Sequence, residues 1–246
     1  MDLRRIIEHT QLRPDATAAD IQTVVEEAVE HRFFGVCVAS SWVPIVKEKL
    51  SGLDATNLVR IVSVVGFPHG NSTTESKIVE AETAIRNGAS EIDMVMHIGW
   101  MKSGRVEYTL DDMKRVVMAC KSLGAEAVKI ILETGYLTVD EIRVACKLAL
   151  AADAQFVKTS TGFGPRGASV DDILIMRSEV GTKIGIKASG GIRTYEEALC
   201  LIKAGATRLG ASGSIKLVED QRFGVATQGL RSSSNSYKLR RRTKTL

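Results

Sequence analysis

One arrangement recurs along this chain: a short apolar run rich in β-branched residues, a polar turn, and then an amphipathic helical pattern that starts at a Ser or Thr. Short apolar runs of this kind are typical of parallel strands that are buried on both faces. They occupy residues 35–40, 60–67, 91–99, 127–135, 156–162, 185–191 and 206–212, and residues 6–10 offer a short run ahead of the first helix. The alternation predicts eight parallel strands with helices between them.

The helix boundaries are marked by their own residue types. A Ser or Thr followed three residues later by an acidic residue can satisfy the free amides at a helix start, and a left-handed glycine can end a helix. The predicted starts are Thr17/Asp20, Ser72/Glu75, Thr138/Glu141, Ser169/Asp172 and Thr194/Glu197. The predicted ends are Gly35, Gly52, Gly88, Gly124, Gly181 and Gly205.

Eight strands that alternate with helices favour a closed barrel over an open sheet. Eight is a number of strands that closes a barrel with a filled interior, and such barrels form one domain of about 250 residues. The alternative, an open doubly wound sheet, usually shows a G-x-G-x-x-G turn after an early strand, and no such turn stands there in this sequence. We therefore predict an α/β protein, with a single (β/α)8 TIM barrel over residues 1–220.

The basic residues of the chain gather at its carboxyl end. The formal net charge is +4, but residues 221–246 contain seven basic residues and no acidic residue, so the rest of the chain is mildly acidic. The same segment is rich in Ser and has few apolar residues to bury, which predicts a disordered tail after the barrel.

The amino terminus and the cysteines indicate the surroundings of the protein. The first residues carry charges where a signal peptide needs an apolar stretch, and no apolar run reaches membrane-spanning length. The four cysteines are widely spaced and include no C-x-x-C pair, so neither a zinc ribbon nor a disulfide framework is indicated. We expect a cytoplasmic protein that does not engage a membrane.

Polar residues near the ends of the predicted strands are the candidates for chemistry, because the active sites of these barrels lie at the carboxyl ends of the strands. Lys158 and Lys187 lie near the ends of consecutive strands. Either lysine alone fits a stem packed on the rim with its ammonium in water. Together, two neighbouring ammonium groups oppose each other's charge, and the neutral amine that results is what imine formation needs. Asp93, inside an apolar run, fits a buried ion pair with one of these lysines or a proton relay beside them.

Two glycine-rich loops indicate a phosphate site. Residues 189–193 and 210–214 follow the last two predicted strands, where barrels of this class frequently bind phosphate. Glycine lets backbone amides approach an anion, and Ser212, Ser214 and Arg193 can add donors, although each loop alone fits an ordinary turn. His9, His69 and His97 lack a metal-binding spacing, so we interpret them as satisfied polar residues. Glu133 and Thr134 are expected on the pocket wall.

With these residues identified, the chain from about residue 6 to residue 214 resembles the deoxyribose-phosphate aldolase family. The resemblance is carried, in order, by IEHTQLRPDAT, VCV, VVGFPHG, EIDMV, KIILETGYLT, FVKTSTGF, IKASGGIRT and RLGAS. It implies a class I aldolase of deoxyribose phosphate catabolism, which reversibly cleaves 2-deoxy-D-ribose 5-phosphate to D-glyceraldehyde 3-phosphate and acetaldehyde through a lysine Schiff base. It also implies that neither a metal nor an organic cofactor takes part.

Site residues follow from the resemblance position by position. Lys158 is expected to form the Schiff base, with Asp93 and Lys187 as proton donors and acceptors. The expected substrate- and phosphate-binding residues are Thr10, Cys37, Thr159, Gly162, Gly190, Gly191, Arg193, Gly210, Ser212 and Gly213. A small sugar phosphate is the expected partner, and a homodimer is compatible with the sequence.

This chain departs from the family pattern at three places near the pocket. His97 stands where the family usually has Asn, Glu8 where it has Asp, and Ala39-Ser40 where it has Asn-Pro, which bears on rate and substrate range. Some family members use a C-terminal tyrosine near the pocket, for which Tyr237 is the candidate here.

Two alternative functions stay open at this point. One is another lysine-dependent sugar-phosphate barrel enzyme, such as a transaldolase-like protein. The other is a nucleic-acid-binding protein that acts through its basic tail, although no base-reading motif accompanies the tail, and we expect no nucleic-acid partner.

Overall fold

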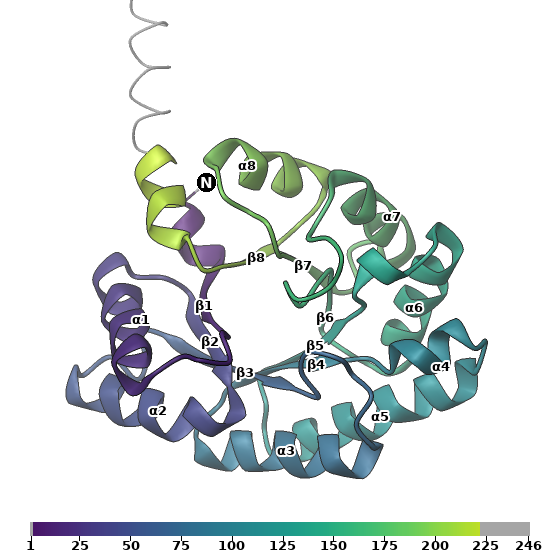
Figure 1. Ribbon diagram of the computed structural model, residues 1–246, viewed down its shortest axis with the longest axis horizontal. Helices are drawn as coiled ribbons and strands as arrows, with labels where there is room; N and C mark the ends of the chain where they lie inside the picture. Colours follow the sequence, from purple (N-terminus) through teal and green to yellow (C-terminus); the bar gives the residue numbers. More distant parts are fainter. Residues whose placement is uncertain (1, 222–246) are drawn as a thin grey trace, which may run out of the picture.

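In the computed structural model, residues 2–221 are described, and they form the predicted closed barrel (Figure 1). Each strand pairs in parallel with the next one in the sequence, and the last pairs with the first. The strands are β1 (Ile7–Gln11), β2 (Gly35–Ala39), β3 (Arg60–Val65), β4 (Glu91–Val95), β5 (Ala127–Ile131), β6 (Phe156–Lys158), β7 (Gly185–Ser189) and β8 (Arg208–Ala211). All eight predicted strands, including the short first one, are confirmed.

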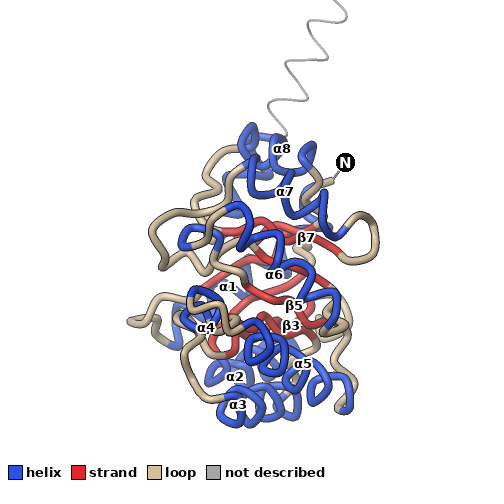
Figure 2. The backbone as a smooth tube through the Cα atoms, turned by 90° about the vertical axis from the view of Figure 1, so that its right-hand side faces the viewer, coloured by secondary structure: helices blue, strands red, loops and turns tan. Residues whose placement is uncertain are grey.

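The helices surround the strands, as Figure 2 shows. They are α1 (Ala18–His31), α2 (Val43–Gly52), α3 (Thr74–Asn87), α4 (Ile98–Lys102), α5 (Val106–Ser122), α6 (Val139–Ala151), α7 (Val170–Val180) and α8 (Tyr195–Ala204), with short 3-10 turns at Leu3–Ile6, Ser40–Trp42 and Thr134–Tyr136. Residues 214–221 are also helical. No helix between residues 2 and 221 is long and apolar enough to span a bilayer. Of the predicted tail, only residue 221 is described, and the rest, with Tyr237, lies outside the described residues.

The predicted helix starts are largely confirmed. Full reciprocal capping boxes form at Thr17, Thr138 and Thr194. Ser169 caps α7 as predicted, but the Asp172 carboxylate binds other partners instead of completing the box. The prediction at Ser72/Glu75 is wrong by one residue, because the next hydroxyl residue in the run Ser-Thr-Thr caps α3 instead. Local pattern alone does not choose among adjacent hydroxyl residues.

The predicted helix ends agree less uniformly with the structure. Gly88, Gly181 and Gly205 cap α3, α7 and α8, while Gly124 lies just past α5 and Gly52 is the last residue of α2. Gly35 does not end a helix. Arg32 takes the left-handed conformation after α1, at φ 55°, and Gly35 begins β2. A Cβ at Gly35 would lie 2.8 Å from the Arg60 carbonyl oxygen, so close strand approach explains this glycine.

A buried ion pair joins α3 to α5 outside the barrel. The Lys77 ammonium donates to the Asp112 carboxylate at 2.7 Å and to the Val95 carbonyl at 3.0 Å, and the Thr74 hydroxyl donates to Asp112 at 2.8 Å. Neither charged side chain is exposed. Burial lowers the pKa of Lys77, and Asp112 opposes that shift.

Replacing Asp112 with alanine should therefore destabilise the protein strongly. The Lys77 ammonium would stay buried without its carboxylate, which typically costs about 3–5 kcal/mol of unfolding free energy. Thr74→Val removes one hydrogen bond from the same cluster and should cost about 0.5–1.5 kcal/mol. Denaturant unfolding measures both variants, and equal losses would mean that the charge of Lys77 is compensated in another way.

Candidate active site

The two predicted lysines and the predicted aspartate meet inside the barrel. Lys158 and Lys187 are directly paired residues of β6 and β7, which confirms that they lie at matching depth. Both donate to the same oxygen of Asp93, Oδ2, at 2.8 Å and 2.6 Å. Asp93 comes from the middle of β4 and is fully buried. The buried ion pair expected for Asp93 is thus present, with both lysines as partners.

Sequence reasoning missed further members of this charged cluster. Lys129 of β5 donates to Asp93 Oδ1 at 2.8 Å and lies 2.6 Å from a Glu91 oxygen. Glu8 of β1 accepts from Lys187, and its other oxygen lies 2.9 Å from Arg208. Lys129 also stands in an apolar run, AVKII, so the signal that singled out Asp93 could have found it as well.

Opposite charges outweigh burial throughout this cluster. Burial alone would raise the pKa of the Asp93 carboxyl, but Lys129, Lys158 and Lys187 hold it well below its usual range. Burial alone would lower the pKa of Lys187, but the carboxylates of Asp93 and Glu8 raise it above its ordinary value. Asp93 therefore stays an anion and Lys187 a cation at neutral pH. Among the described residues, Lys158 has a single carboxylate partner, Asp93, which it shares with two other lysines.

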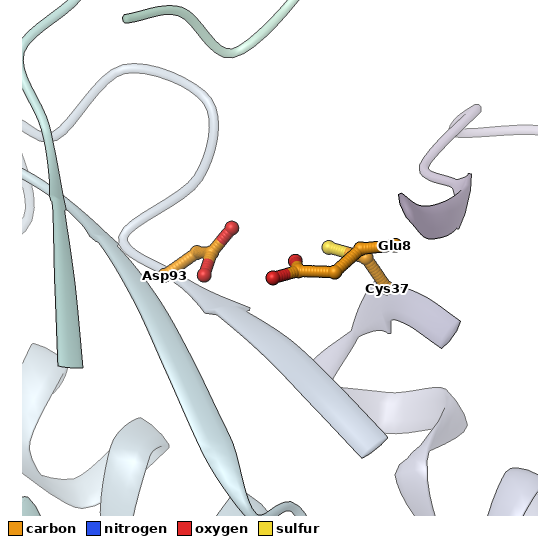
Figure 3. Close-up of side chains that lie close together, drawn as sticks. All are labelled: Glu8, Cys37 and Asp93. Carbon is orange, nitrogen blue, oxygen red and sulfur yellow. The ribbon is translucent and has the colours of Figure 1, made fainter. Parts of the chain in front are cut away.

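Three possible metal ligands also converge here. Figure 3 shows the carboxylates of Glu8 and Asp93 pointing toward each other, with the Cys37 sulfur beside Glu8, and their ligand atoms all lie within 4.8 Å of one another. Both carboxylates already accept from buried lysines. Burial also raises the pKa of the Cys37 thiol, which keeps it protonated. A cation at this place would have to displace ammonium groups, so the donor set does not fit a metal.

The three histidines lie at two places: His69 and His97 line the same cavity, and His9 lies elsewhere. His9 is buried between Ser214, at 3.0 Å, and Glu27, at 2.6 Å, as expected of a satisfied polar residue. His97 accepts from the Trp100 amide at 3.1 Å and stacks on the Trp100 ring. Ser214 was a candidate phosphate donor, but it is buried and bonded to His9 and to the Ala211 carbonyl.

A cavity of about 480 Å³ opens at the carboxyl ends of the strands, and Lys158 lies on its wall. Both predicted phosphate loops contribute to this cavity. The predicted binding residues on its wall are Thr10, Gly162, Gly190, Gly191, Arg193, Gly210 and Ser212. Gly190 and Gly191 have φ values of 84° and 76°, a conformation that other residues rarely adopt. These glycines are therefore required where the loop backbone turns toward the cavity.

Three predicted binding residues lie elsewhere. Cys37 is buried and does not line the cavity, and Gly213 does not line it either. Thr159 is fully buried, where its hydroxyl bonds both the amide and the carbonyl of Ser189 and so ties the end of β6 to β7. Ser189, Ile192 and Ala211 of the two predicted loops also line the cavity, and sequence reasoning missed five further wall residues: Gln11, Leu12, Arg13, Thr161 and Phe163.

A second cavity of about 310 Å³ adjoins the first, and Thr161 and Phe163 line both. Glu133 lies on the wall of this second cavity and not on that of the cavity with Lys158, whereas Thr134 is buried and bonds Asp172. The departure at His97 also lies on this wall. The departure at Glu8 lies in the charged cluster, and the Ser40 hydroxyl donates to Glu80 of α3 at 2.8 Å.

The comparisons with known proteins agree with this geometry. Residues 2–227 match the model of the DeoC/LacD family aldolase. The chain is 48% identical over 220 residues to a deoxyribose-phosphate aldolase of Caldanaerobacter subterraneus subsp. tengcongensis, covering 89% of this chain and 94% of the relative. It is 49% identical over 218 residues to that of Enterococcus faecalis, covering 89% and 96%. A tetrameric deoxyribose phosphate aldolase structure from Aeropyrum pernix aligns with a TM-score of 0.80 and 33% identity, covering 89% of this chain and 91% of that one. This chain is a member of the DeoC/LacD family of aldolases.

Proposed function

We propose that this protein is a class I deoxyribose-phosphate aldolase, which reversibly cleaves 2-deoxy-D-ribose 5-phosphate to D-glyceraldehyde 3-phosphate and acetaldehyde. One observation carries the proposal: Lys158 lies on the wall of a cavity that two glycine loops also line, and its amine binds the same Asp93 oxygen as the Lys187 ammonium. An amine, an anion site and a proton-handling pair are together what an imine-forming aldolase of a sugar phosphate needs.

The chemistry begins at the nitrogen of Lys158. The neutral amine attacks the C1 aldehyde of the sugar, and loss of water gives a protonated imine. Removal of the C3 hydroxyl proton then lets the C2–C3 bond break, with its electron pair moving into the imine to form an enamine. D-Glyceraldehyde 3-phosphate leaves, C2 takes a proton, and water releases acetaldehyde and free Lys158.

Asp93 and Lys187 transfer protons in opposite directions next to the Lys158 nitrogen. Asp93 is an anion in contact with the Lys158 amine, so it can relay the proton that the amine must lose, and its lowered pKa means that the proton passes on and does not stay on the carboxylate. Lys187 remains a cation, held by Asp93 and Glu8, and can donate toward the departing hydroxyl of the carbinolamine. The glycine loops after β7 and β8, with Arg193 and Ser212, would hold the phosphate.

Borohydride trapping tests the proposed reaction. With 2-deoxy-D-ribose 5-phosphate present, borohydride should inactivate the enzyme irreversibly, because reduction fixes the imine as a secondary amine. Peptide mass analysis should place the adduct on Lys158. An adduct on another lysine, or none, would contradict the proposal. Cleavage rates with a panel of other sugar phosphates separate this function from that of a transaldolase-like enzyme.

Replacing Arg193 with methionine should weaken binding of phosphorylated substrate selectively. The variant keeps the stem on the cavity wall but removes a charged donor, so KM for 2-deoxy-D-ribose 5-phosphate should rise about tenfold. KM for unphosphorylated 2-deoxy-D-ribose should not change. Steady-state kinetics with both sugars measure the difference, and equal effects on the two would show that Arg193 does not contact the phosphate.

The sugar phosphate is the proposed partner of this chain. The Aeropyrum pernix relative is described as a tetramer, and a homodimer of this chain stays a prediction. The cytoplasmic location also stays a prediction. The basic tail that could attract nucleic acid lies outside the described residues.

A further inference from the structure

Glu133 stands at an irregular point between β5 and β6. The Leu132 amide donates to the Lys158 carbonyl at 2.9 Å, and the Thr134 amide donates to the Thr159 carbonyl at 3.0 Å. Leu132 and Thr134, which are two residues apart, therefore bond to Lys158 and Thr159, which are consecutive; a regular ladder would join residues that are two apart on both strands. Glu133 is the extra residue, as in a β-bulge, a feature that often redirects a side chain beside an active site. The bulge lies directly beside Lys158.

Both the backbone and the side chain of Glu133 are in unfavourable states in the folded protein. Its φ is 54°, in the left-handed region that side-chain-bearing residues seldom occupy. Its carboxylate is buried, and no described residue donates to its Oε1. Gly164 closes over the carboxyl group, since a Cβ at Gly164 would lie 2.8 Å from it. Backbone strain and an unsatisfied buried oxygen both destabilise the folded state, so stability alone does not account for this residue.

The other carboxylate oxygen of Glu133 organises the segment that follows Lys158. Oε2 accepts the Thr161 amide at 3.0 Å and also the Thr161 hydroxyl. The Thr161 hydroxyl oxygen accepts the Phe163 amide at 3.0 Å in turn. One oxygen thus fixes residues 161–163, which we call the dividing wall. All three residues line the cavity that contains Lys158, and Thr161 and Phe163 also line the second cavity.

We propose that Glu133 is a positioning residue that sets the dividing wall against the carbon chain of the substrate, an inference that rests on the proposed aldolase function. The phosphate loops come from β7 and β8, whereas the dividing wall follows β6, the strand that carries Lys158. The dividing wall begins three residues after Lys158 and lines the same cavity as the phosphate loops, and this proximity to the reacting amine is the ground for setting it against the carbon chain. Hydrogen bonds to a carboxylate are stronger than those to a neutral amide, so the charge of Glu133 stiffens the wall.

Two nearly isosteric variants test this role. Glu133→Gln keeps the shape but removes the charge, and Thr161→Val keeps the shape but removes the hydroxyl. Each should raise KM for 2-deoxy-D-ribose 5-phosphate about tenfold while kcat changes little, as expected when a charge-assisted contact that orders the binding wall is lost. Thr161→Ser restores the hydroxyl and should return KM to near the wild-type value. The double variant should raise KM by less than the product of the single effects, because both changes disrupt one contact.

The effect should be the same for 2-deoxy-D-ribose with and without its phosphate. Asp112→Asn is the matched control, since it neutralises a buried carboxylate that lines neither of the two cavities, and should lower the melting temperature without altering KM. Unchanged KM in both single variants, a fully multiplicative double variant, or a KM effect confined to the phosphorylated sugar would overturn the proposal. Whether the wild-type enzyme cleaves 2-deoxy-D-ribose 5-phosphate tests the aldolase function. The positioning role is tested separately, by the ratio of each variant's KM to the wild-type KM.

Discussion

Replacing Lys158 with methionine should abolish cleavage of 2-deoxy-D-ribose 5-phosphate at every pH and remove all borohydride-dependent labelling. Methionine fills a similar volume, but it has no nitrogen with which to form the imine, so the rate should fall by several orders of magnitude. The fold should survive, because Asp93 keeps two other lysine partners. Cleavage assays and intact-protein mass after borohydride treatment check the result, and substantial residual cleavage would place the imine elsewhere.

Lys187→Met is the informative control for that experiment. It removes a neighbouring cation and leaves the Lys158 amine in place, so cleavage should fall steeply while borohydride still labels Lys158 slowly. Because Lys187 is held as a cation by two carboxylates, the variant removes a proton donor as well as a charge. A near-normal rate would show that Lys187 is structural and takes no part in proton transfer.

Replacing Asp93 with asparagine should damage both activity and stability. Three lysine ammonium groups contact this one carboxylate. Loss of its charge leaves them buried and mutually repulsive, which should cost about 3–5 kcal/mol of unfolding free energy at pH 7. Cleavage should fall with it, because the amine loses its proton acceptor. Denaturant unfolding measures the loss of stability, and single-turnover cleavage measures the loss of activity. Asp112→Asn is the control, because it should lose stability and keep its activity.

The pH dependence of this loss has a definite sign. The pKa of Asp93 is lowered in the folded protein, so its ionised form contributes stability above the ordinary aspartate pKa. That contribution disappears as the pH falls through the lowered value. The stability difference between wild type and Asp93→Asn should therefore be complete at pH 7 and shrink once the pH drops below about 3.9. A difference that grows on acidification would contradict the assigned charge of Asp93.

The fold could be predicted from the sequence because its signals are local. Buried parallel strands and capped helices each leave a mark within a few residues, and only ambiguous marks failed: the run Ser72-Thr73-Thr74 offers adjacent caps, and Gly35 serves close packing instead of a helix end. Lys158 and Lys187 were found for the same reason, since each lies in a recognisable strand, Lys158 as the last residue of β6 and Lys187 in the middle of β7.

The rest of the site depends on contacts that no local pattern contains. Arg208 meets Glu8 across 200 residues of sequence, and the two become neighbours only when β8 pairs with β1. The bulge at Glu133 depends equally on pairing with a second strand. Thr159 was expected in the pocket from the family resemblance, but its side chain is buried in the contact with Ser189 and does not line the cavity.

In the charged cluster, the negative and the positive side chains come from different halves of the barrel. Its carboxylates belong to Glu8 on β1 and to Glu91 and Asp93 on β4, whereas its cations come from β5, β6, β7 and β8. Within this cluster, an isolated amino-terminal half-barrel would contribute carboxylates alone and an isolated carboxyl-terminal half cations alone, and neither set can be buried without the other. The two halves are therefore electrostatic complements, and the interior becomes neutral enough to dehydrate only when they close on each other.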